Sequence, residues 1–515
     1  MYLTSLSTKS RPFLCLITFV VVAGLGFSCN TPTEKEPVNF LFYIADDMSP
    51  FAESQKIPGF RRIAEQGVTF SQAYTNAPSC TPARGVLLTG LPMWKLREGS
   101  TLFGALPADL PVFPLLLEEA GYFVGHTGKA WGPGSLAAGG WADDVNPVGR
   151  AYQDIKIEPQ PAGMSNVDYA ANFEAFISEK PADQPFFFWY GSFEPHRRFE
   201  AGQGLASGKT LDDAYVPASM PNHEVIQNDI LDYDIEVEHA DNHFSRILAK
   251  LEAIGELENT VIIVTSDHGM PFPRAKATGL YDDATRIPLM FSGPGISGNS
   301  RVVSDFVGLM DLAPTILDLA GLPQPEGMVG QSIKPQLNAE ANGRLDQTRD
   351  HMILALERHT IARPDYKGYP MRAIRTDDHL LVHNYEPTRW PAGDPDYISI
   401  HQGIFGDIDA GPAKDFIIDI ANNPELAEFH TWATAQRPEY ELFDLSSDPA
   451  QLVNVAGDSK YLTVRDSLNT LLDGYLKSNG DPRAFGKSPW DENIYYFGDL
   501  PDTMPTPDPN RWDLD

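Results

Sequence analysis

The chain has 515 residues, of which 70 are acidic and 39 basic, so its formal net charge at pH 7 is −31. This balance argues against nucleic acid as a partner, because binding a phosphate backbone needs a basic surface. With 42% hydrophobic residues the chain can bury a large core, and its length predicts two or more domains. An anionic substrate would be repelled at long range, so a site for one must be locally basic.

Residues 1–29 are predicted to be an export signal. Basic residues precede an uncharged apolar run over residues 13–27, which is too short for a comfortable membrane span. The residues before Cys29 resemble a bacterial lipoprotein box, with Cys29 as the lipidated first residue of the mature chain; cleavage without lipidation is the alternative. Residues 30–37 then form a polar tether. We expect a periplasmic protein or a lipoprotein of the outer membrane or cell surface.

The chain has three cysteines, Cys15, Cys29 and Cys80. The first two fall in the predicted signal segment, so the folded body carries Cys80 alone and a disulfide framework is excluded. In an exported protein an unpaired thiol is open to oxidation unless it is buried or chemically converted.

The first predicted strand is the apolar run over residues 38–44, which is followed by Asp46 and Asp47. Such runs are typical of parallel strands that are buried on both faces. In open α/β sheets, ligands bind beyond the carboxyl ends of the strands. Two adjacent carboxylates there repel each other unless a cation such as Ca²⁺ holds them. A turn or a helix cap is the alternative reading of this pair.

A short helix is predicted after Ser79, with Thr81 as the N-cap, Pro82 at the first helical position and Gly90 at the end. Cys80 then lies at a helix N-terminus, where free N–H groups and the helix dipole favour an anion. Arg84 follows about one turn later and can clamp a tetrahedral oxyanion with its fork of donors.

Three further strands are predicted over residues 121–125, 185–190 and 261–266. Helical patterns over 113–120 and 234–251 separate them, so the sequence predicts an α/β fold with a mostly parallel sheet. Each strand leads into residues that can bind a metal or an oxyanion. Because the carboxyl ends of parallel strands meet at one edge, these residues are expected to form a single site. They are His126 to Lys129, Glu194 to Arg197, and Asp267 to Gly269.

The pattern Cys80-x-Pro82-x-Arg84, followed by Leu88-Thr89-Gly90, resembles the signature of the type I sulfatases. The resemblance implies an alkaline-phosphatase-like catalytic domain. It also implies that a formylglycine-generating or sulfatase-maturing enzyme oxidises Cys80 to formylglycine, whose hydrate is the nucleophile. An ordinary capped helix with a buried cysteine is the alternative reading of these residues.

The resemblance extends residue by residue to the other strand ends. It implies a Ca²⁺ ion bound by Asp46 and Asp47 as the first pair of ligands and by Asp267 and His268 as the second pair. It further implies a histidine near the leaving oxygen, His196. The sulfate would be bound by Arg84, Lys129 and Lys276. A surface lysine or a core histidine is the structural alternative at each single position.

Four segments resemble the heparan N-sulfatase, or sulfamidase, branch of this family. They are Glu194–Arg197, Thr265–Pro273, Tyr369–Ile374 and Arg437–Pro449. The resemblance covers most of the mature chain and is specific for the sulfatase class. It is much less specific for the substrate, so the sugar, N- against O-sulfate, and exo against endo action stay open.

One position departs from the family pattern. Many members have a histidine two residues after the active-site lysine, where it takes a proton from the formylglycine hydrate; here the residue is Trp131. Another base is then required, and His126 and His268 are candidates by residue type. Alternatively, Trp131 forms a wall of the pocket and the step is slower.

The C-terminal part is predicted to be a smaller α+β domain over residues 345–515, after a catalytic domain over 38–344. Residues 371–384 read as an antiparallel hairpin around Asp377-Asp378, and the tail after Lys487 reads as irregular. Candidate substrate contacts in this part are Glu357, Arg358, His359, Arg389 and Trp390.

Together, these patterns predict a hydrolase that releases inorganic sulfate from sulfate esters or N-sulfates of sulfated saccharides, using formylglycine and Ca²⁺. One alternative is a phosphodiesterase or phosphonate hydrolase of the same superfamily, which could use the same metal geometry. The other is a surface lipoprotein that binds glycans without catalysis.

Overall fold

The computed structural model of the chain describes residues 37–399, 402–492 and 496–497. The predicted signal peptide over 1–29 and nearly all of the tether over 30–37, with Cys15 and Cys29, lie outside the described residues. The chain separates into two units, Met1–Pro37 and Val38–Asp515. The second unit is described below.

An eight-stranded sheet forms the centre of this unit, in the order β4-β3-β5-β1-β6-β7-β2-β8. The first predicted strand is β1 (Asn39–Ala45), which pairs in parallel with β5 and β6 and is buried along its whole length. β7 is antiparallel to both of its neighbours. The prediction of an α/β fold with a mostly parallel sheet is therefore confirmed. The other strands are β2 (Val68–Tyr74), β3 (Phe123–Gly128), β4 (Arg150–Ala151), β5 (Phe186–Gly191), β6 (Thr260–Ser266), β7 (Leu289–Ser292) and β8 (Arg301–Gly308).

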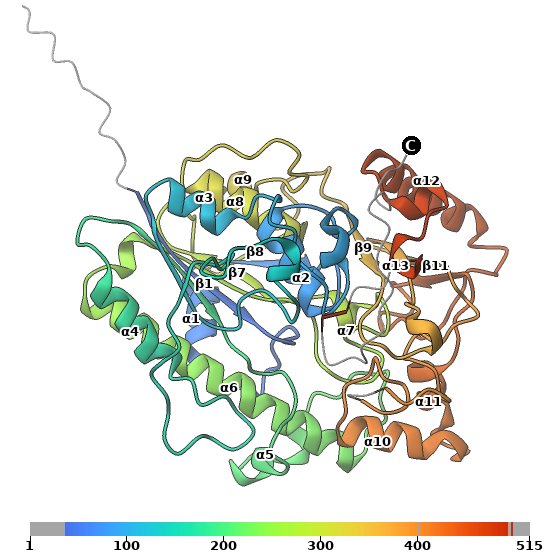
Figure 1. Cartoon of the computed structure of the whole chain (residues 1–515). Coiled ribbons are helices and arrows are strands. Elements are labelled where there is room, and N and C mark those ends of the chain that lie inside the picture. The colour runs from blue at the N-terminus through green and yellow to red at the C-terminus, as the bar shows by residue number, and fades with distance from the viewer. Residues whose placement is uncertain (1–36, 400–401, 493–495, 498–515) are drawn as a thin grey trace, which may run out of the picture. The chain divides into compact units, whose positions relative to one another are not determined.

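Helices cover both faces of this sheet. Side chains alternate between the two faces along each strand, so a fully buried strand packs against helices on both sides. In β1, Phe40 and Phe42 pack with α2, α3 and α8, whereas Leu41 and Tyr43 pack with α1, α4 and α6. Figure 1 shows α3 and α8 above the sheet and α1, α4 and α6 below it. These helices are α1 (Pro58–Gln66), α2 (Cys80–Thr89), α3 (Phe113–Glu119), α4 (Tyr169–Glu179), α6 (Glu224–Ala253) and α8 (Leu312–Leu319).

Two predicted elements have different boundaries in the structure. The helix predicted over 234–251 is the 30-residue α6, because a buried stripe continues upstream through Ile226 and Ile230 and the His223 side chain caps the helix start. β3 begins two residues later than predicted and continues to Gly128, because it stays paired with β5 as far as Gly191. His126 therefore lies within the strand instead of following it.

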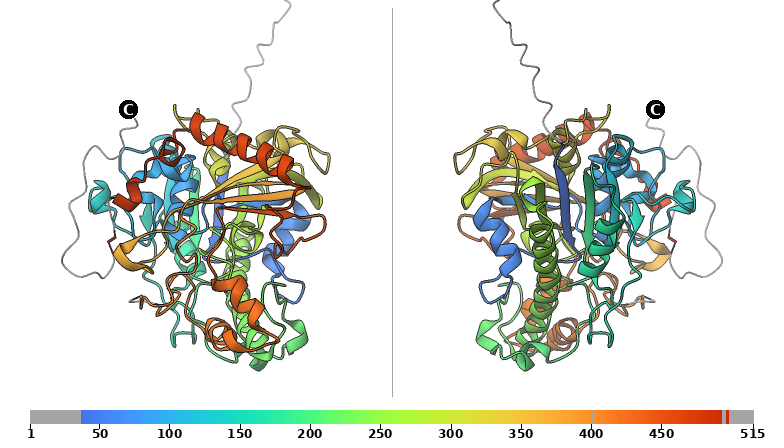
Figure 2. Two further views of the ribbon diagram at one scale, coloured as in Figure 1. Left: turned by 90° about the vertical axis from the view of Figure 1, so that its right-hand side faces the viewer. Right: turned by 90° about the vertical axis from the view of Figure 1, so that its left-hand side faces the viewer.

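The C-terminal part contains a second, fully antiparallel sheet in the order β12-β11-β10-β9. Its strands are β9 (His351–Leu356), β10 (Met371–Thr376), β11 (His379–Asn384) and β12 (Tyr440–Asp444). The predicted hairpin is confirmed as β10 and β11. Helix α12 (Leu462–Ser478), drawn in red in Figure 2, packs along this sheet through Leu472 and Leu476. The predicted boundary at residues 344/345 falls between β8 and β9, and it stays a prediction.

Shorter helices lie in the connections and near the C-terminus. The tail predicted to be irregular contains α13, whose Trp490 is buried and whose Asp491 is paired with Arg389. Among the described residues, no helix is both long enough and apolar enough to span a membrane. The shorter α-helices are α5 (Gln203–Ala206), α7 (Asp282–Thr285), α9 (Lys334–Asn338), α10 (Pro412–Asp419), α11 (Ala427–Thr434) and α13 (Pro489–Glu492).

Glu236, in the middle of α6, is a buried carboxyl group. Its side chain is 1% exposed, and its Oε2 atom has no hydrogen-bond partner among the described residues. Burial, together with the neighbouring carboxylates of Glu194 and Asp232, raises the pKa of Glu236 to about 9. Glu236 is therefore protonated in the folded protein at neutral pH, whereas it is ionised in the unfolded chain.

This difference predicts the effect of Glu236→Gln. Between pH 4.5 and 9 the folded state binds a proton that the unfolded chain has released, so the fold loses stability as the pH rises through this range. Glutamine carries no such proton. We expect Glu236→Gln to raise the free energy of unfolding by about 1–3 kcal/mol at pH 8 and by little at pH 4.5. Urea unfolding at both pH values measures this.

The control is Glu252→Gln, at an exposed ion pair with Arg62. This variant should differ from the parent by less than about 0.5 kcal/mol at both pH values. A gain for Glu236→Gln that is equal at pH 4.5 and pH 8 would contradict the assignment of a proton to Glu236.

Candidate active site

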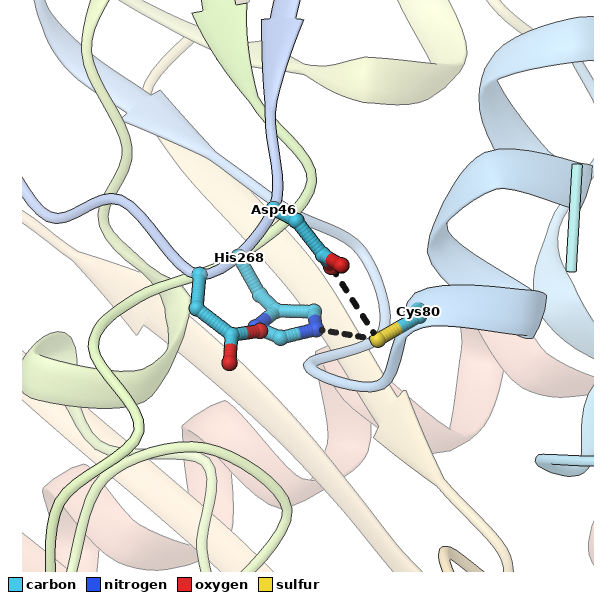
Figure 3. Close-up of side chains that lie close together, drawn as sticks. Asp46, Cys80 and His268 are labelled. Atoms are coloured by element: carbon cyan, nitrogen blue, oxygen red, sulfur yellow. Dashed lines mark hydrogen bonds and ion pairs between the residues drawn. The ribbon is translucent and has the colours of Figure 1, made fainter. Parts of the chain in front are cut away.

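Four neighbouring strands, β3, β5, β1 and β6, end at the same edge of the large sheet, as the sequence predicts. Asp46 and Asp47 follow β1, and Asp267 and His268 follow β6. Cys80 begins α2 beside them. Its Sγ atom lies 3.4 Å from Asp46 Oδ1 and 3.4 Å from His268 Nε2, as Figure 3 shows.

Helix α2 begins two residues earlier than predicted, at Cys80 instead of Pro82. Its N-cap is Ser79 instead of Thr81, whose backbone is already helical and whose hydroxyl donates to the carbonyl of Pro133. The Ser79 hydroxyl is in turn hydrogen-bonded to His359 Nδ1 at 2.9 Å. Gly90 ends the helix as predicted, with a left-handed backbone (φ 63°) that suits glycine.

The thiol of Cys80 is a poor nucleophile in this environment. The residue is 2% exposed, and burial together with the Asp46 carboxylate raises the pKa of its thiol well above the usual range. Because the thiolate is the reactive form of cysteine, the unmodified side chain is held in its unreactive form.

Arg84 is fully buried and uses its donors within the protein. Its Nε donates to Asp267 Oδ2 at 2.9 Å, and Nη1 donates to the carbonyls of Lys129 and Ala130 at 3.0 and 2.9 Å. Nη2 donates to the carbonyl of Ala45 at 3.3 Å. Arg84 thus holds together the ends of β1, β3 and β6. Within the described part of the chain, it is not among the residues that line the cavity.

Two lysines neutralise the pair of aspartates after β1. Lys129 Nζ lies 2.5 Å from Asp46 Oδ2, and Lys276 Nζ lies 2.7 Å from Asp47 Oδ2. Burial would raise the pKa of Asp46, but Lys129 and other nearby cations hold it well below its usual range. For Asp47, burial prevails over Lys276 and raises the pKa to about 7. Asp47 is therefore short of positive charge.

The residues around Asp47 fit a hard divalent cation. Donor atoms of Asp46, Asp47, His268 and Cys80 lie within 4.8 Å of one another. The buried Oδ1 atom of Asp47 has no hydrogen-bond partner among the described residues, and a cation would supply one. Asp267, the fourth predicted ligand, lies at the edge of this group. Its Oδ1 is 3.7 Å from His268 Nε2 and accepts the backbone N–H groups of Asp47 and His268.

His196 lies on the open side of this group, after β5. Its Nδ1 atom is 2.6 Å from the carbonyl of Arg197, so Nδ1 carries a proton and Nε2 is directed elsewhere. Nε2 lies 4.0 Å from Asp47 Oδ2. Burial and the nearby Lys276 ammonium lower the pKa of His196.

A cavity of about 860 Å³ opens at this edge of the sheet. Cys80, Lys129, Lys276 and His196 line it together, so the structure brings these predicted residues to one space. Trp131 lines the cavity as well, in agreement with the alternative in which this residue forms a wall of the pocket. His126 lines it too, but burial lowers its pKa to about 4, and its Nδ1 lies 2.9 Å from the carbonyl of Gly149.

Some residues of this cavity carry no sequence signal. Asp409, in a loop before α10, lies 3.0 Å from Lys276 Nζ through Oδ2, so Lys276 bridges Asp47 and Asp409. Arg198 and Gln402 also line the cavity. These residues lie in segments without a periodic pattern or a recognisable motif, so tertiary packing alone brings them to the site.

The candidate substrate contacts of the C-terminal part lie in different places in the structure, some at the cavity and some away from it. His359 lines the cavity. Glu357 is instead buried between Arg372 and Arg483, with ion pairs of 2.7 and 2.6 Å. Arg389 pairs with Asp491 at 3.1 Å. The remaining two, Arg358 and Trp390, are not among the described residues that line the cavity.

Comparison with known proteins agrees with this geometry. The family model described as Sulfatase matches residues 39–322, and the model described as N-sulphoglucosamine sulphohydrolase, C-terminal, matches residues 276–394. Human N-sulphoglucosamine sulphohydrolase is 27% identical over 491 residues, which cover 87% of this chain and 91% of that protein. The predicted resemblance to sulfatases, and to the sulfamidase branch among them, is confirmed.

Solved structures share the fold at lower identity. The structure of BT4656 in complex with its substrate D-glucosamine-2-N,6-O-disulfate has a TM-score of 0.62 at 20% identity, covering 86% of this chain and 98% of that one. The phosphonate monoester hydrolase of Agrobacterium radiobacter has a TM-score of 0.62 at 19% identity, covering 86% and 96%. The two fold relatives thus act on different chemical groups.

The contacts of Arg84 predict a large cost for Arg84→Lys. A single ammonium cannot replace a guanidinium that bonds Asp267 and three carbonyls, so buried acceptors lose their partners. We expect the free energy of unfolding to fall by about 2–4 kcal/mol, measured as a lower urea midpoint with an unchanged slope.

The matched control is Arg62→Lys, which keeps the charge at an exposed ion pair with Glu252. It should change the free energy of unfolding by less than about 0.5 kcal/mol. Equal stabilities of the two variants would show that Arg84 does not hold the strand ends together.

Proposed function

Because this chain belongs to the sulfatase family and is therefore a sulfuric ester hydrolase, we propose that it removes sulfate from sulfated glycosaminoglycan saccharides. The observation that carries the proposal is the meeting of Cys80, two buried aspartates and two lysines at one cavity. A substrate unit of glucosamine carrying N-sulfate is supported by the match of residues 276–394 to the N-sulphoglucosamine sulphohydrolase model and by the human relative, with O-sulfate as the alternative.

The proposal includes two groups that the chain must acquire. Formylglycine, made from Cys80 by a maturing enzyme, supplies through its hydrate the hydroxyl that attacks sulfur. The suppressed reactivity of the Cys80 thiol supports this conversion. Ca²⁺ would supply Lewis-acid stabilisation of the sulfate oxygens. The buried Oδ1 atom of Asp47, which has no hydrogen-bond partner among the described residues and lies 3.4 Å from His268 Nδ1, supports a cation there. Its ligands would be Asp46, Asp47, Asp267 and His268.

The chain's own residues would bind and orient the sulfate group. Lys129 and Lys276 present ammonium groups to the cavity beside Cys80, where they would neutralise the charge on the sulfate oxygens. Arg84 would act as a positioning residue that fixes Asp267 and the strand ends. In its doubly protonated form His196 would donate a proton from Nε2 to the departing oxygen or nitrogen, while its Nδ1 proton stays on the carbonyl of Arg197; the anionic sulfate group would favour this imidazolium form.

His268 is a candidate base in place of the histidine missing at Trp131, as an alternative to its role as a ligand of the cation. Its Nε2 atom lies 3.4 Å from Cys80 Sγ, within reach of a proton on the side chain at position 80. Its Nδ1 atom lies 3.1 Å from the carbonyl of Gly269, which leaves Nε2 as the acceptor. As a ligand of the cation, the same atom would have no lone pair left to accept a proton, so the two roles exclude each other.

The proposed setting is an exported enzyme with a sulfated glycan as its substrate. The predicted signal over residues 1–29 and the predicted lipidation of Cys29 support a periplasmic or surface location. The acidic balance, with a net charge of −31, argues against nucleic acid as a partner. The division into a catalytic domain over 38–344 and a smaller domain over 345–515 belongs to the same proposal.

A phosphodiesterase or phosphonate monoester hydrolase is the second candidate function. It is favoured by the fold shared with the phosphonate monoester hydrolase of Agrobacterium radiobacter. A non-catalytic glycan-binding role fits the family less well, because sulfatases are hydrolases.

The main experiment uses the enzyme produced in a host that installs formylglycine, with Ca²⁺ present. Ion chromatography should detect free sulfate from N-sulfoglucosamine or from O-sulfated glucosamine, at a rate that exceeds hydrolysis of a phosphonate monoester. Cys80→Ala should lower the rate by more than about 10³-fold, because no nucleophile remains at position 80. Faster phosphonate hydrolysis would instead favour the second candidate.

Cys80→Ser gives a sharper test of the group at position 80. A single hydroxyl can attack sulfur once but cannot expel the sulfate again. We therefore expect one equivalent of leaving group per site, with the mass of one sulfate added to the peptide that contains position 80 and no free sulfate. Sustained turnover by this variant would contradict the need for formylglycine.

The two roles of His268 are separated by His268→Asn. The asparagine oxygen can still bind Ca²⁺ but cannot accept a proton. If His268 is the base, kcat at saturating Ca²⁺ falls by about 10²–10⁴-fold, while the Ca²⁺ affinity measured by calorimetry changes little. The comparison variant His126→Asn tests the other candidate base. A large loss there, with His268→Asn near the parental rate, would transfer the role to His126.

A further inference from the structure

Among the described residues that line the cavity, each lysine and arginine forms an ion pair with one or more carboxylates, except Arg198. Lys129 pairs with Asp46, and Lys276 pairs with both Asp47 and Asp409. Arg197 pairs with Asp229. For the guanidinium of Arg198, the described residues provide neither a hydrogen bond nor an ion pair, although it lines the same cavity.

The residues on both sides of Arg198 are fixed by contacts with other parts of the protein. Arg197 donates to both carboxylate oxygens of Asp229 in α6, at 2.8 and 2.6 Å, and to the carbonyl of Pro271 at 3.0 Å. Its guanidinium carbon lies 4.5 and 4.6 Å from the ring centroids of Phe199 and Phe272. The backbone around Arg198 is therefore anchored on two sides.

Arg197 is also enclosed by the loop before α10. A Cβ atom at Gly411 would lie only 2.2 Å from Nη1 of Arg197, so the absence of a side chain there leaves room for the guanidinium. With Arg197 and Phe199 packed against the protein, Arg198 is exposed and left to form part of the cavity wall. Because its backbone is already anchored, binding a ligand orders only the side chain of Arg198 and not the surrounding segment.

An unpaired guanidinium has a clear chemical preference. Arginine binds carboxylate and sulfate-like groups through two parallel N–H donors, and such charge-assisted hydrogen bonds are stronger than neutral ones. The scissile sulfate is already provided with cations at Cys80, by Lys129 and Lys276. The chain carries a net charge of −31, so a polyanionic substrate gains from each local cation that the protein does not neutralise itself.

We propose that Arg198 binds a second anionic group of the substrate, either a further sulfate on the same sugar or the carboxylate of an adjacent uronate. This inference rests on the proposed function, since it adds a specificity residue to the same site. It implies that the enzyme prefers saccharides with two anionic groups over those with the scissile sulfate alone. Phe193, which is 39% exposed and lines the cavity, offers an apolar surface for the sugar between the two groups.

The test compares substrates that differ by one anionic group. The probes are glucosamine 2-N-sulfate, glucosamine 2-N,6-O-disulfate, and N-sulfoglucosamine linked to a uronate. For Arg198→Gln we expect kcat/KM to fall by about 10- to 100-fold on a probe with the second anion, mostly through KM, and by less than about threefold on the monosulfate. Loss on the disulfate identifies a sulfate partner, and loss on the uronate probe identifies a carboxylate partner.

Two further variants separate recognition from general effects. Arg198→Lys keeps the charge without the planar fork, so it should recover part of the lost preference. Arg62→Gln removes the same charge at the exposed ion pair with Glu252 and should leave the preference unchanged. Melting temperatures close to that of the parent confirm that all variants are folded.

A binding measurement distinguishes failure of this inference from failure of the proposed function. In a Cys80→Ala background, calorimetry gives the Kd of each probe without turnover. An Arg198→Gln variant that weakens all probes equally, or none of them, would overturn the role of Arg198. Failure of the parental enzyme to release sulfate from any probe would instead overturn the proposed function, while the Kd comparison still decides the role of Arg198.

Discussion

The structure of this site depends on the cost of burying three carboxylates at one sheet edge. Asp46, Asp47 and Asp267 are each at most 1% exposed, and a buried charge is tolerated only when it is paired. Lys129, Lys276 and Arg84 each meet one of these carboxylates. Because Asp47 remains short of positive charge, a cation bound beside it would stabilise its carboxylate and complete the site.

Four of the eight strands of the large sheet, β1, β3, β5 and β6, could be predicted, because each is a nearly continuous apolar run. A strand buried on both faces, such as β1, must be apolar throughout, and the polar residues that follow it therefore stand out. The antiparallel hairpin of β10 and β11 was predictable for a related reason, since turn-forming residues separate two short strand patterns. The start of α2 was harder to predict, because Ser79 and Thr81 are both good N-caps and in the structure both hydroxyls bind groups outside the helix, Thr81 to Pro133 and Ser79 to His359.

The remainder of the site could not be predicted, because it comes from loops. Asp409 and Arg198 carry no periodic pattern, and their positions depend on long-range packing that a local sequence does not encode. Arg198 lines the cavity because Arg197 and Phe199 are anchored by α6 and by the segment after β6. Trp131, by contrast, could be singled out from the sequence, because it departs from the family pattern. The structure places it in the core cluster of the large sheet and in the cavity wall.

The complete burial of α2 has a consequence for the order of events in the life of the chain. Every residue of the helix, from Cys80 to Thr89, is buried. Its N-cap, Ser79, is bonded to His359, which lies 280 positions further along the chain. An enzyme that has to grip the backbone around Cys80 finds no such surface once this contact has formed. An enzyme that acts on Cys80 would therefore need the chain before the C-terminal part folds over this helix.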